Sequence, residues 1–321
     1  MQIIYRKPLR RYSKGAEVIQ LQKALVQLGY NPKGIDGHFG PGCEAAVKQF
    51  QVDNKLKVDG IAGPATYRMI NANLRNQDIA NPISNSPLYT KMRRYNSNVH
   101  ILTLDSTYQL DIELGQRYKL ETVSSIIANK RRSNPSVIGG VNGGFFNFNA
   151  SSEHLGLLID EGLYYSPPSE HFIDFLYYKN GTVKIVNLHG YDKELLSNLQ
   201  RDTHFSIGTS YSLIQQGAVN LENSERFDHA KYRNPRTLLG VKKDGTFLLV
   251  AVDGRSSINL GVTALQSARI MQELNAYQAV NLDGGGSSTM VVVENGVPVV
   301  KNKIPGGRER AVGSVLLAYK K

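Results

Sequence analysis

The sequence predicts an α+β protein in which a small three-helix bundle precedes a larger, mixed domain rich in strands. A phrase of the form D-G-x-x-G-P occurs twice in the first 75 residues, and helical patterns flank both copies. Further along, short apolar runs bounded by Gly, Asn and Asp dominate, as is typical of strands joined by turns. A chain of 321 residues also exceeds the usual size of one core, so we expect two domains.

The repeated phrase predicts how the first domain is built. Its two copies are Asp36–Pro41 and Asp59–Pro64. Asp-Gly favours a turn and Pro favours the first helical position, so each copy predicts a turn that leads into a helix. We expect Asp36 and Asp59 to brace these turns. The helix upstream ends at Gly29 and has one apolar face, formed by Val18, Leu21, Leu25 and Leu28.

Residues 1–75 resemble the peptidoglycan-binding domain type 1 family. The matching segments are GAEVIQLQKALVQLGY, DGHFGPGCEAAVKQFQ and DGIAGPATY, which together cover nearly the whole domain. Cys43 stands where the family usually has Thr. As the only cysteine it forms no internal disulfide, and we expect it to be packed in the bundle. The resemblance implies a non-catalytic anchor on the bacterial cell wall.

Positive charge is concentrated in this first domain. It carries 12 Lys and Arg against 5 Asp and Glu, whereas the rest of the chain carries 26 against 22. Such a basic surface suits an anionic polymer, and charge alone leaves nucleic acid, acidic lipid and teichoic-acid-bearing wall open. We expect no nucleic-acid partner, because the basic residues fall in the wall-binding pattern without an aromatic-basic stripe. No apolar run approaches about 18 residues, so no membrane insertion is expected.

A linker is expected between the two domains. Residues 76–88, NQDIANPISNSPL, lack apolar periodicity and contain two prolines, so the second domain is expected over residues 89–321. Within it, the sequence predicts two hairpin turns and two helices, at Asn180-Gly181, Asp244-Gly245, Leu120–Lys130 and Thr263–Asn275, the last with Thr263 as N-cap.

Four polar or glycine-rich clusters follow apolar runs of the second domain, in the kind of loop where catalytic residues concentrate. They are Asn142–Asn147, Pro235–Thr237, Val252–Arg255 and Asn281–Thr289. Taken singly, each of the first three clusters has a plain structural alternative. These are a Gly turn for the first, a surface ion pair for the second, and a turn Asp paired with its neighbour for the third. The three consecutive glycines of the fourth cost chain entropy that a plain turn does not require, which favours an anion-binding loop.

Other catalytic patterns are missing from the sequence. It has no H-E-x-x-H and no G-x-S-x-G, and its glycine loop has neither the Gly-Lys-Ser/Thr ending of a Walker loop nor the spacing of a dinucleotide fingerprint. The seven histidines lack metal-ligand spacing. His154, beside Glu153, is the one singled out as a candidate, with an ordinary surface His as the alternative.

In this order and spacing, the four clusters and the ending GRERAVGSVLLAY resemble the phosphodiester glycosidase family over roughly residues 95–320. The resemblance marks as site residues Asn142, Arg236, Asp253, Arg255, Asn281, Asp283, Ser287, Ser288 and Arg310. We add His154, Gly284, Gly285 and Gly286 as candidates for substrate binding. One position departs from the family, since Gln266 stands where the family usually has the Glu of G-x-T-x-x-E. If that Glu carries charge in catalysis, Gln266 cannot replace it; if it only hydrogen-bonds, Gln266 suffices.

The implied reaction suits these residue types. A glycosyl-1-phosphodiester has a phosphate monoester as leaving group, which needs less general-acid help than an alkoxide and more clamping of charge. Arg236, Arg255 and Arg310, with the amides of Gly284–Gly286, are expected to supply the clamp. A carboxylate stabilises or attacks the anomeric carbon, with Asp283 as first candidate and Asp253 as second. No cofactor is required, and a divalent cation shared by the two carboxylates is left open.

The sequence therefore predicts an extracellular, cell-wall-associated hydrolase of glycosyl-1-phosphodiester bonds, acting on a sugar-1-phosphate wall teichoic acid or a similar anionic glycopolymer. The N-terminus has no standard secretory signal, so the export route is not visible. Two alternatives stay open. One is a catalytically inactive wall- or phage-associated binding protein, which Gln266 keeps in view. The other is a peptidoglycan hydrolase, although neither a zinc triad nor a Glu/Asp pair is recognisable.

Overall fold

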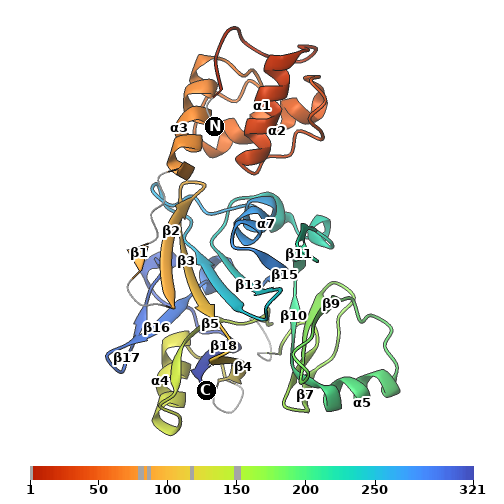
Figure 1. Ribbon diagram of the computed structural model, residues 1–321, viewed down its shortest axis with the longest axis vertical. Coiled ribbons are helices and arrows are strands. Elements are labelled where there is room, and N and C mark those ends of the chain that lie inside the picture. Colours follow the sequence, from red (N-terminus) through yellow and green to blue (C-terminus); the bar gives the residue numbers. More distant parts are fainter. Residues whose placement is uncertain (1–2, 79–82, 85–87, 116–118, 148–152) are drawn as a thin grey trace. The chain divides into compact units, whose positions relative to one another are not determined.

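The computed structural model describes residues 3–78, 83–84, 88–115, 119–147 and 153–321, and the chain divides into two units (Figure 1). The first unit is Met1–Asn81 with Arg93–Asn96, and the second is Pro82–Met92 with Ser97–Lys321. Each unit has its own hydrophobic core. Most of the predicted linker, residues 76–88, lies outside the residues whose side chains are described.

Three helices build the first unit, as the sequence predicts. They are α1 (Ala16–Gln27), α2 (Pro41–Asp53) and α3 (Pro64–Asp78). The prolines of the two D-G-x-x-G-P copies each occupy the first position of a helix, where a missing N–H costs nothing. Cys43 is buried in the bundle, as expected, and burial raises the pKa of its thiol to about 12. Because such a thiol stays protonated, Cys43 contributes to packing and does not act as a nucleophile.

A buried glutamine clamps each of the two turns. The Gln22 side chain donates to Asp36 Oδ1 at 2.8 Å and to the His38 carbonyl at 3.0 Å, and it accepts from the Gly37 N–H at 2.9 Å. Gln51 makes the same set of bonds to Asp59, Ile61 and Gly60 in the second copy. The expectation that Asp36 and Asp59 brace the turns is therefore confirmed.

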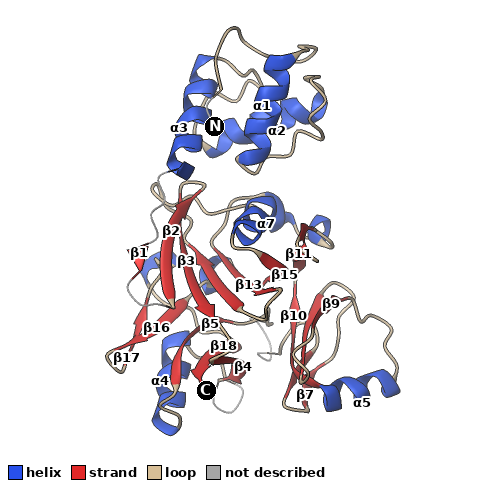
Figure 2. Cartoon of the chain, in the orientation of Figure 1, coloured by secondary structure: helices blue, strands red, loops and turns tan. Residues whose placement is uncertain are grey.

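Among the described residues, three antiparallel sheets build the second unit (Figure 2), so the predicted α+β class is confirmed. The largest has the order β1-β2-β3-β14-β13-β15-β11-β12, with bounds Ile83–Ser84, Tyr89–Arg94, Ser97–Leu104, Phe247–Val252, Arg236–Lys242, Ala276–Asn281, Tyr211–Gln215 and Ala218–Val219. The second has the order β7-β6-β10-β8-β9, with bounds Leu163–Ser166, Leu158–Asp160, Thr203–Thr209, Ile173–Tyr178 and Val183–Val186. The third has the order β17-β16-β5-β18-β4, with bounds Val297–Val300, Met290–Glu294, Val137–Asn142, Ser314–Lys320 and Tyr108–Leu114.

Helices cover these sheets or fill the connections between strands. They are α4 (Val123–Ser133), α5 (Lys193–Asp202), α6 (Asp228–Lys231) and α7 (Ala264–Glu273). The helix predicted over Leu120–Lys130 begins three residues later than expected, because Thr122 is its N-cap and Glu121 pairs with Val312 as a β-bridge. The two predicted hairpin turns are confirmed, between β8 and β9 and between β13 and β14. No described helix is long and apolar enough to cross a membrane.

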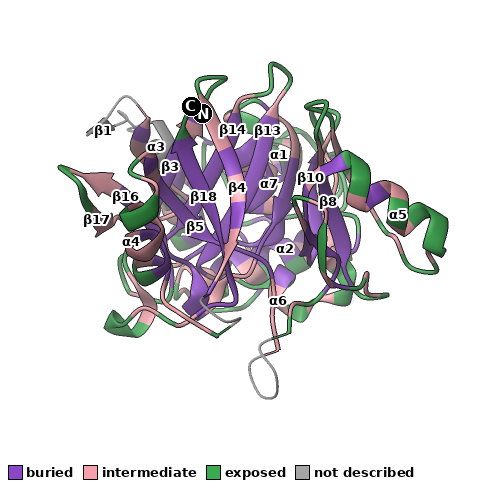
Figure 3. Cartoon of the chain, turned by 90° about the horizontal axis from the view of Figure 1, so that it is seen from below, coloured by how far each residue is buried: buried purple, intermediate pink, exposed green. Residues whose placement is uncertain are grey.

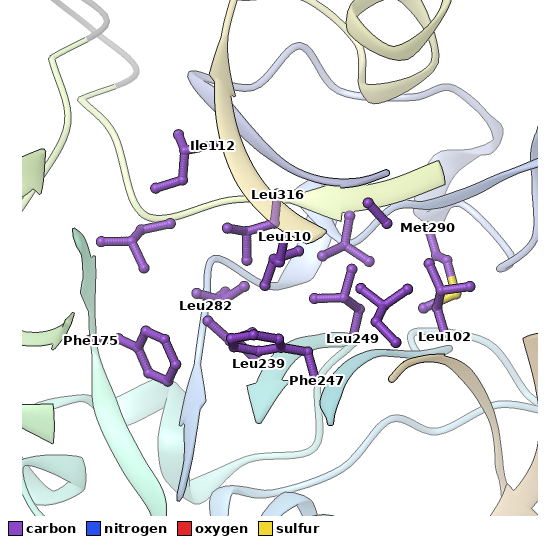
Figure 4. Close-up of a cluster of buried hydrophobic side chains, with 14 of the residues drawn as sticks. Leu102, Leu110, Ile112, Phe175, Leu239, Phe247, Leu249, Leu282, Met290 and Leu316 are labelled. Atoms are coloured by element: carbon purple, nitrogen blue, oxygen red, sulfur yellow. The ribbon is translucent and has the colours of Figure 1, made fainter. Parts of the chain in front are cut away.

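One apolar layer lies between the sheets and fixes their strands relative to one another. Side chains from all three sheets meet in it, as the close-up shows for Leu102, Phe175, Leu239, Met290 and Leu316 (Figure 4). Most residues of the strands that carry them are buried (Figure 3). The loops that leave these strands therefore start from rigid positions, which is what a precisely arranged site requires.

The glutamine clamp can be tested with two variants of α1. Gln22→Ala leaves the Gly37 N–H and the Asp36 carboxylate without their partner, so it should destabilise the first unit by about 2 kcal/mol. Gln20→Ala, at an exposed position of the same helix, should leave stability unchanged. Thermal unfolding followed by circular dichroism measures both, and equal melting temperatures for the two variants would contradict the clamp.

Candidate active site

Strand direction brings three of the four clusters to one edge of the large sheet. β13 pairs antiparallel with both β14 and β15, so the end of β14, the end of β15 and the start of β13 share that edge. Asp253 follows β14, Asp283 follows β15, and Arg236 begins β13. The fourth cluster joins them from the third sheet, since Asn142 ends β5.

A pocket of about 150 Å³ opens where these loops meet. Its lining combines two arginines, one carboxylate and two aromatic rings with the glycine loop: Phe145, His229, Asn234, Arg236, Arg255, Asp283, Gly284 and Gly285. The structure therefore brings together Arg236, Arg255, Asp283 and two of the loop glycines, all of which the sequence marked.

The three consecutive glycines make room for three arginine-bearing segments. A Cβ on Gly284 would lie 2.9 Å from the Pro235 carbonyl oxygen, directly before Arg236. A Cβ on Gly285, whose φ is +61°, would lie 3.0 Å from the Arg255 guanidinium. A Cβ on Gly286 would overlap the Arg310 guanidinium. A side chain at position 285 or 286 would displace an arginine, and one at position 284 would press on the backbone that leads into Arg236.

Several amides of the glycine loop are already hydrogen-bonded within the protein. The Gly285 N–H donates to the Pro235 carbonyl at 2.9 Å, and the Ser287 N–H donates to the Gly284 carbonyl. The Gly284 N–H hydrogen-bonds the Asp283 carboxylate and lowers its pKa. The Gly284 and Gly285 amides therefore hold the loop and its aspartate in shape, and anion binding by the amides of Gly284–Gly286 stays a prediction.

Arg236 is a buried cation at the pocket wall. Only 1% of its surface is exposed, yet no carboxylate lies within ion-pair distance of it among the described residues. Its Nε donates to the Val262 carbonyl at 3.1 Å, and its Nη2 donates to the carbonyls of His229 and Tyr232 at 2.6 and 3.0 Å. Three carbonyls orient the guanidinium without neutralising it, and burial, with a smaller contribution from Arg255, lowers its pKa. A desolvated positive charge of this kind favours an anionic ligand.

Arg255 and Arg310 add positive charge around the glycine loop. Arg255 is exposed, and its Nη2 donates to Asn234 Oδ1 at 3.3 Å. Its backbone is left-handed, with φ at +56°. Arg310 lies against Gly286 and close enough to Asp283 to lower the pKa of that carboxyl. Arg236 and Arg255 line the pocket itself, whereas Arg310 does not and lies against Gly286.

Asp283 is the pocket carboxylate, and its surroundings raise its pKa toward neutral pH. Burial raises its pKa from 3.8 to about 6, although Ser287, Arg310 and the Gly284 N–H act in the opposite direction. Ser287 Oγ is buried without a hydrogen-bond partner among the described residues, and it lies near enough to Asp283 to lower the pKa of that carboxyl. A carboxylate that is desolvated in a pocket is a typical catalytic arrangement.

Asp253 does not line the pocket. Its Oδ1 accepts from the Lys303 N–H at 2.8 Å and lies 3.4 Å from His100 Nε2, and its Oδ2 accepts from Asn98 Nδ2 at 2.9 Å. Burial alone would raise its pKa, but these neighbours lower it overall. The structure thus gives Asp253 a bracing position that anchors the segment leading to Arg310.

Asn142 and Asn281 are wholly buried behind the loop. Asn142 donates to the Asp283 carbonyl at 2.7 Å and accepts from Thr237 Oγ1 and the Thr289 N–H. Asn281 donates to Ser210 Oγ and the Leu282 carbonyl. Asn142 therefore ties three of the clusters together, so the geometry gives it a positioning role and no contact with the pocket.

Two further predicted residues also lie outside the pocket. Ser288 Oγ is buried without a hydrogen-bond partner among the described residues. His154 is mostly buried against Gly313, and burial lowers its pKa to about 4. Contacts of these two residues with a substrate stay a prediction that this geometry does not favour.

His229 and Phe145 line the pocket but escaped the sequence-based selection. Phe145 lies in the NGGFF segment, in which only the Asn and the paired glycines carried a chemical signal. His229 belongs to α6, a helix of four residues in an irregular stretch, where no periodicity or motif marks it. The sequence signal that could have identified His229 is its position shortly before Arg236, the first residue of β13.

Gln266 has a local structural task. It lies at the third position of α7, where its side chain accepts from the Thr263 N–H at 3.0 Å and its N–H donates to Thr263 Oγ1 at 3.2 Å. This is a capping box, in which Glu and Gln serve equally. Of the two possibilities left open by the sequence, the hydrogen-bonding one fits this geometry.

The described residues contain no cluster of three or more His, Cys, Asp or Glu side chains that could hold a metal ion. Asp253 and Asp283 also contact different neighbours. A cation shared by the two stays a prediction.

Comparison with known proteins identifies two families in the chain. The phosphodiester glycosidase family matches residues 135–319, and the peptidoglycan binding domain family matches residues 14–70. The SPbeta prophage-derived uncharacterized protein YomE of Bacillus subtilis is 27% identical over 200 residues, covering 61% of this chain and 29% of YomE. Mouse N-acetylglucosamine-1-phosphodiester alpha-N-acetylglucosaminidase is 27% identical over 164 residues, covering 47% of this chain and 31% of the mouse protein. The chain thus spans less than a third of the length of either relative.

A solved structure shares the fold. The catalytic domain of the zebrafish N-acetylglucosamine-1-phosphodiester alpha-N-acetylglucosaminidase, auto-inhibited by its pro-peptide, superposes with a TM-score of 0.55 at 21% identity. The match covers 76% of this chain and 82% of the zebrafish chain.

The two aspartates should respond oppositely to neutralisation. Asp283 has a raised pKa, so its contribution to stability is full below its ordinary value of 3.8 and is lost as pH rises through about 6. Asp283→Asn should therefore raise stability at pH 8, by up to about 3 kcal/mol for a shift of about two units, and give no gain at pH 4.

Asp253 is the matched comparison. Its lowered pKa means that its contribution is present above the ordinary value and is lost as pH falls through the folded value. Asp253→Asn should lower stability at pH 8 by about 2 kcal/mol. Melting temperatures at pH 4 and 8 measure both, and a loss of stability in Asp283→Asn at pH 8 would refute the proposed environment of Asp283.

The fit between glycine and arginine can be tested by ligand binding. Gly285→Ala combines backbone strain with displacement of Arg255, so it should weaken binding of inorganic phosphate about tenfold, or about 1.4 kcal/mol. Gly296→Ala has similar strain, with φ at +83° and open space around the site, and should bind phosphate like the parent chain. Calorimetric titration distinguishes the two, and equal affinities in both variants would show that the Gly285–Arg255 contact is unimportant for anions.

Proposed function

The chain belongs to the phosphodiester glycosidase family, and from that premise we propose that it hydrolyses the bond between an anomeric carbon and phosphate in an anionic cell-wall glycopolymer. The observation that carries the proposal is the buried Arg236 guanidinium, which lacks a carboxylate partner among the described residues and lines the same pocket as the desolvated Asp283. An unneutralised cation beside a carboxylate suits a substrate with a negative phosphate next to a carbon that becomes positive.

Arg236 and Arg255 would bind the phosphate. As the glycosidic bond breaks, negative charge grows on the leaving phosphate monoester, and preorganised guanidinium groups stabilise it. Three backbone carbonyls already orient Arg236, so little reorganisation is needed when the substrate binds. This arrangement replaces much of the general-acid assistance that an alkoxide leaving group requires.

Asp283 would act on the anomeric carbon. That carbon develops oxocarbenium character, which an ionised carboxylate stabilises or attacks, and water completes the hydrolysis. With a pKa of about 6, Asp283 is largely ionised at pH 7 to 8, while its partial desolvation keeps it reactive. Asp253 would support the site indirectly, through the Lys303 N–H.

The N-terminal unit supports a location at the cell wall. Its family binds peptidoglycan, and the surplus of positive charge in this unit suits a wall that carries phosphate polymers. The resemblance to a prophage-derived protein of Bacillus subtilis is consistent with a wall substrate. We propose a wall teichoic acid with sugar-1-phosphate repeats, acted on outside the cell.

The main alternative, a catalytically inactive wall-binding protein, rested on Gln266. Because Gln266 serves as a helix cap, this residue no longer argues for lost activity. The third possibility, a peptidoglycan hydrolase, gains no specific support among the described side chains.

The test is hydrolysis of a purified polymer with sugar-1-phosphate repeats, compared with poly(glycerol phosphate), which lacks anomeric phosphates. The first should release reducing ends and phosphomonoesters, and the second should not. Equal cleavage of both, or release of neither product by the folded full-length chain, would overturn the proposal.

The pH dependence and Asp283→Asn identify the residue responsible. Since the ionised form of Asp283 is needed, kcat/KM should fall as pH drops through about 6. Asp283→Asn should lose activity by about 10²- to 10⁴-fold while gaining thermal stability at pH 8. In Asp253→Asn the fall of kcat/KM near pH 6 should remain. If that fall disappears in Asp253→Asn and remains in Asp283→Asn, the group that titrates is Asp253 and the assignment is reversed.

A further inference from the structure

One wall of the pocket has no part in the phosphate chemistry described so far. It consists of the rings of Phe145 and His229, whose centroids lie 6.1 Å apart at an interplanar angle of 32°. Behind His229 lie Phe227 at 5.2 Å and Tyr211 at 5.9 Å between centroids. Four aromatic rings thus fix the orientation of this wall in a pocket that two arginines also line.

His229 links this wall to the arginine side of the pocket. Its backbone carbonyl accepts from Arg236 Nη2 at 2.6 Å, while its ring lines the pocket. Because both residues line one pocket of about 150 Å³, a phosphate bound by Arg236 brings a group attached to it close to His229. In a glycosyl phosphate one such group is the sugar.

The imidazole of His229 is neutral at physiological pH. Burial and the neighbouring Arg236 lower its pKa to about 4, and Asp228, which acts in the other direction, is itself paired with Lys231 at 2.8 Å. His229 Nε2 is buried and has no hydrogen-bond partner among the described residues. A neutral imidazole has one donor and one acceptor, which suits a hydroxyl or amide group and adds no charge for a phosphate.

We propose that His229 is the residue that positions and selects the sugar, by hydrogen bonding from its ring nitrogens to a hydroxyl or acetamido group while the sugar lies against Phe145. This inference rests on the proposed function and adds a division of labour to it: the arginines bind the phosphate and His229 recognises the glycosyl unit. A site that hydrogen-bonds a substrate group discriminates strongly against ligands that lack it, because its own polar atom is then left unpaired.

Binding measurements on the full-length chain test the division of labour without requiring turnover. The ligands are inorganic phosphate, glucose 1-phosphate and N-acetylglucosamine 1-phosphate, titrated by calorimetry at pH 7.5. The variants are His229→Phe, which keeps an aromatic ring and removes the polar atoms, and His229→Gln, which restores a neutral donor and acceptor. His189→Phe, at an exposed position after β9, is the control.

His229→Phe should weaken binding of at least one glycosyl phosphate about tenfold or more and change phosphate affinity less than twofold. His229→Gln should recover part of the loss, and His189→Phe should match the parent chain. Retained phosphate affinity also shows that each variant is folded around Arg236.

Two results would overturn the inference. In the first, His229→Phe weakens binding of inorganic phosphate as much as binding of the glycosyl phosphates, which means that the ring serves anion binding or the fold. In the second, no affinity changes, which means that the ring does not contact the sugar. Both leave the proposed function standing, provided that the parent chain binds glycosyl phosphates. If the parent chain binds none of the three ligands, the proposed function fails and this inference fails with it.

Discussion

The close approach of three arginine segments to three successive glycines is the constraint on which the site depends. Gly284 faces Pro235 and Arg236, Gly285 faces Arg255, and Gly286 faces Arg310. Like charges repel, so these segments converge only because strand ends and backbone hydrogen bonds force them to. The bond from the Gly285 N–H to the Pro235 carbonyl and the buried Asn142 network supply that force.

The site is arranged before any ligand arrives, and this has an energetic cost. Arg236 is desolvated without a counterion, and Asp283 is desolvated enough for its pKa to rise to about 6. Neither arrangement favours folding on its own account. The apolar layer shared by the three sheets offsets the cost, since it fixes the strands that end at the pocket. The apolar core therefore stabilises the fold, whereas the charged groups in the loops of the site destabilise it.

Much of this site was predictable from the sequence, because glycine repeats and charged residues at strand ends are local signals. The doubled turn, the two hairpins and the residues Arg236, Arg255 and Asp283 were all visible in this way. The choice between Asp253 and Asp283 was not, since both follow strands that end at the same edge. It depends on a partner, the Lys303 N–H, that lies 50 residues from Asp253 along the chain. His229 was hidden for a similar reason, because only the tertiary fold brings a short irregular helix to the pocket.

The capping box of α7 bears on how relatives of this protein are sorted. In this capping box the third helical residue supplies an oxygen acceptor for the Thr263 N–H, and both an amide and a carboxylate provide one. A chain with Gln at this position therefore should not be set aside as a degenerate copy when enzymes are chosen for assay. A better criterion for function is whether the three-glycine loop and its arginines are retained together, since each requires the others.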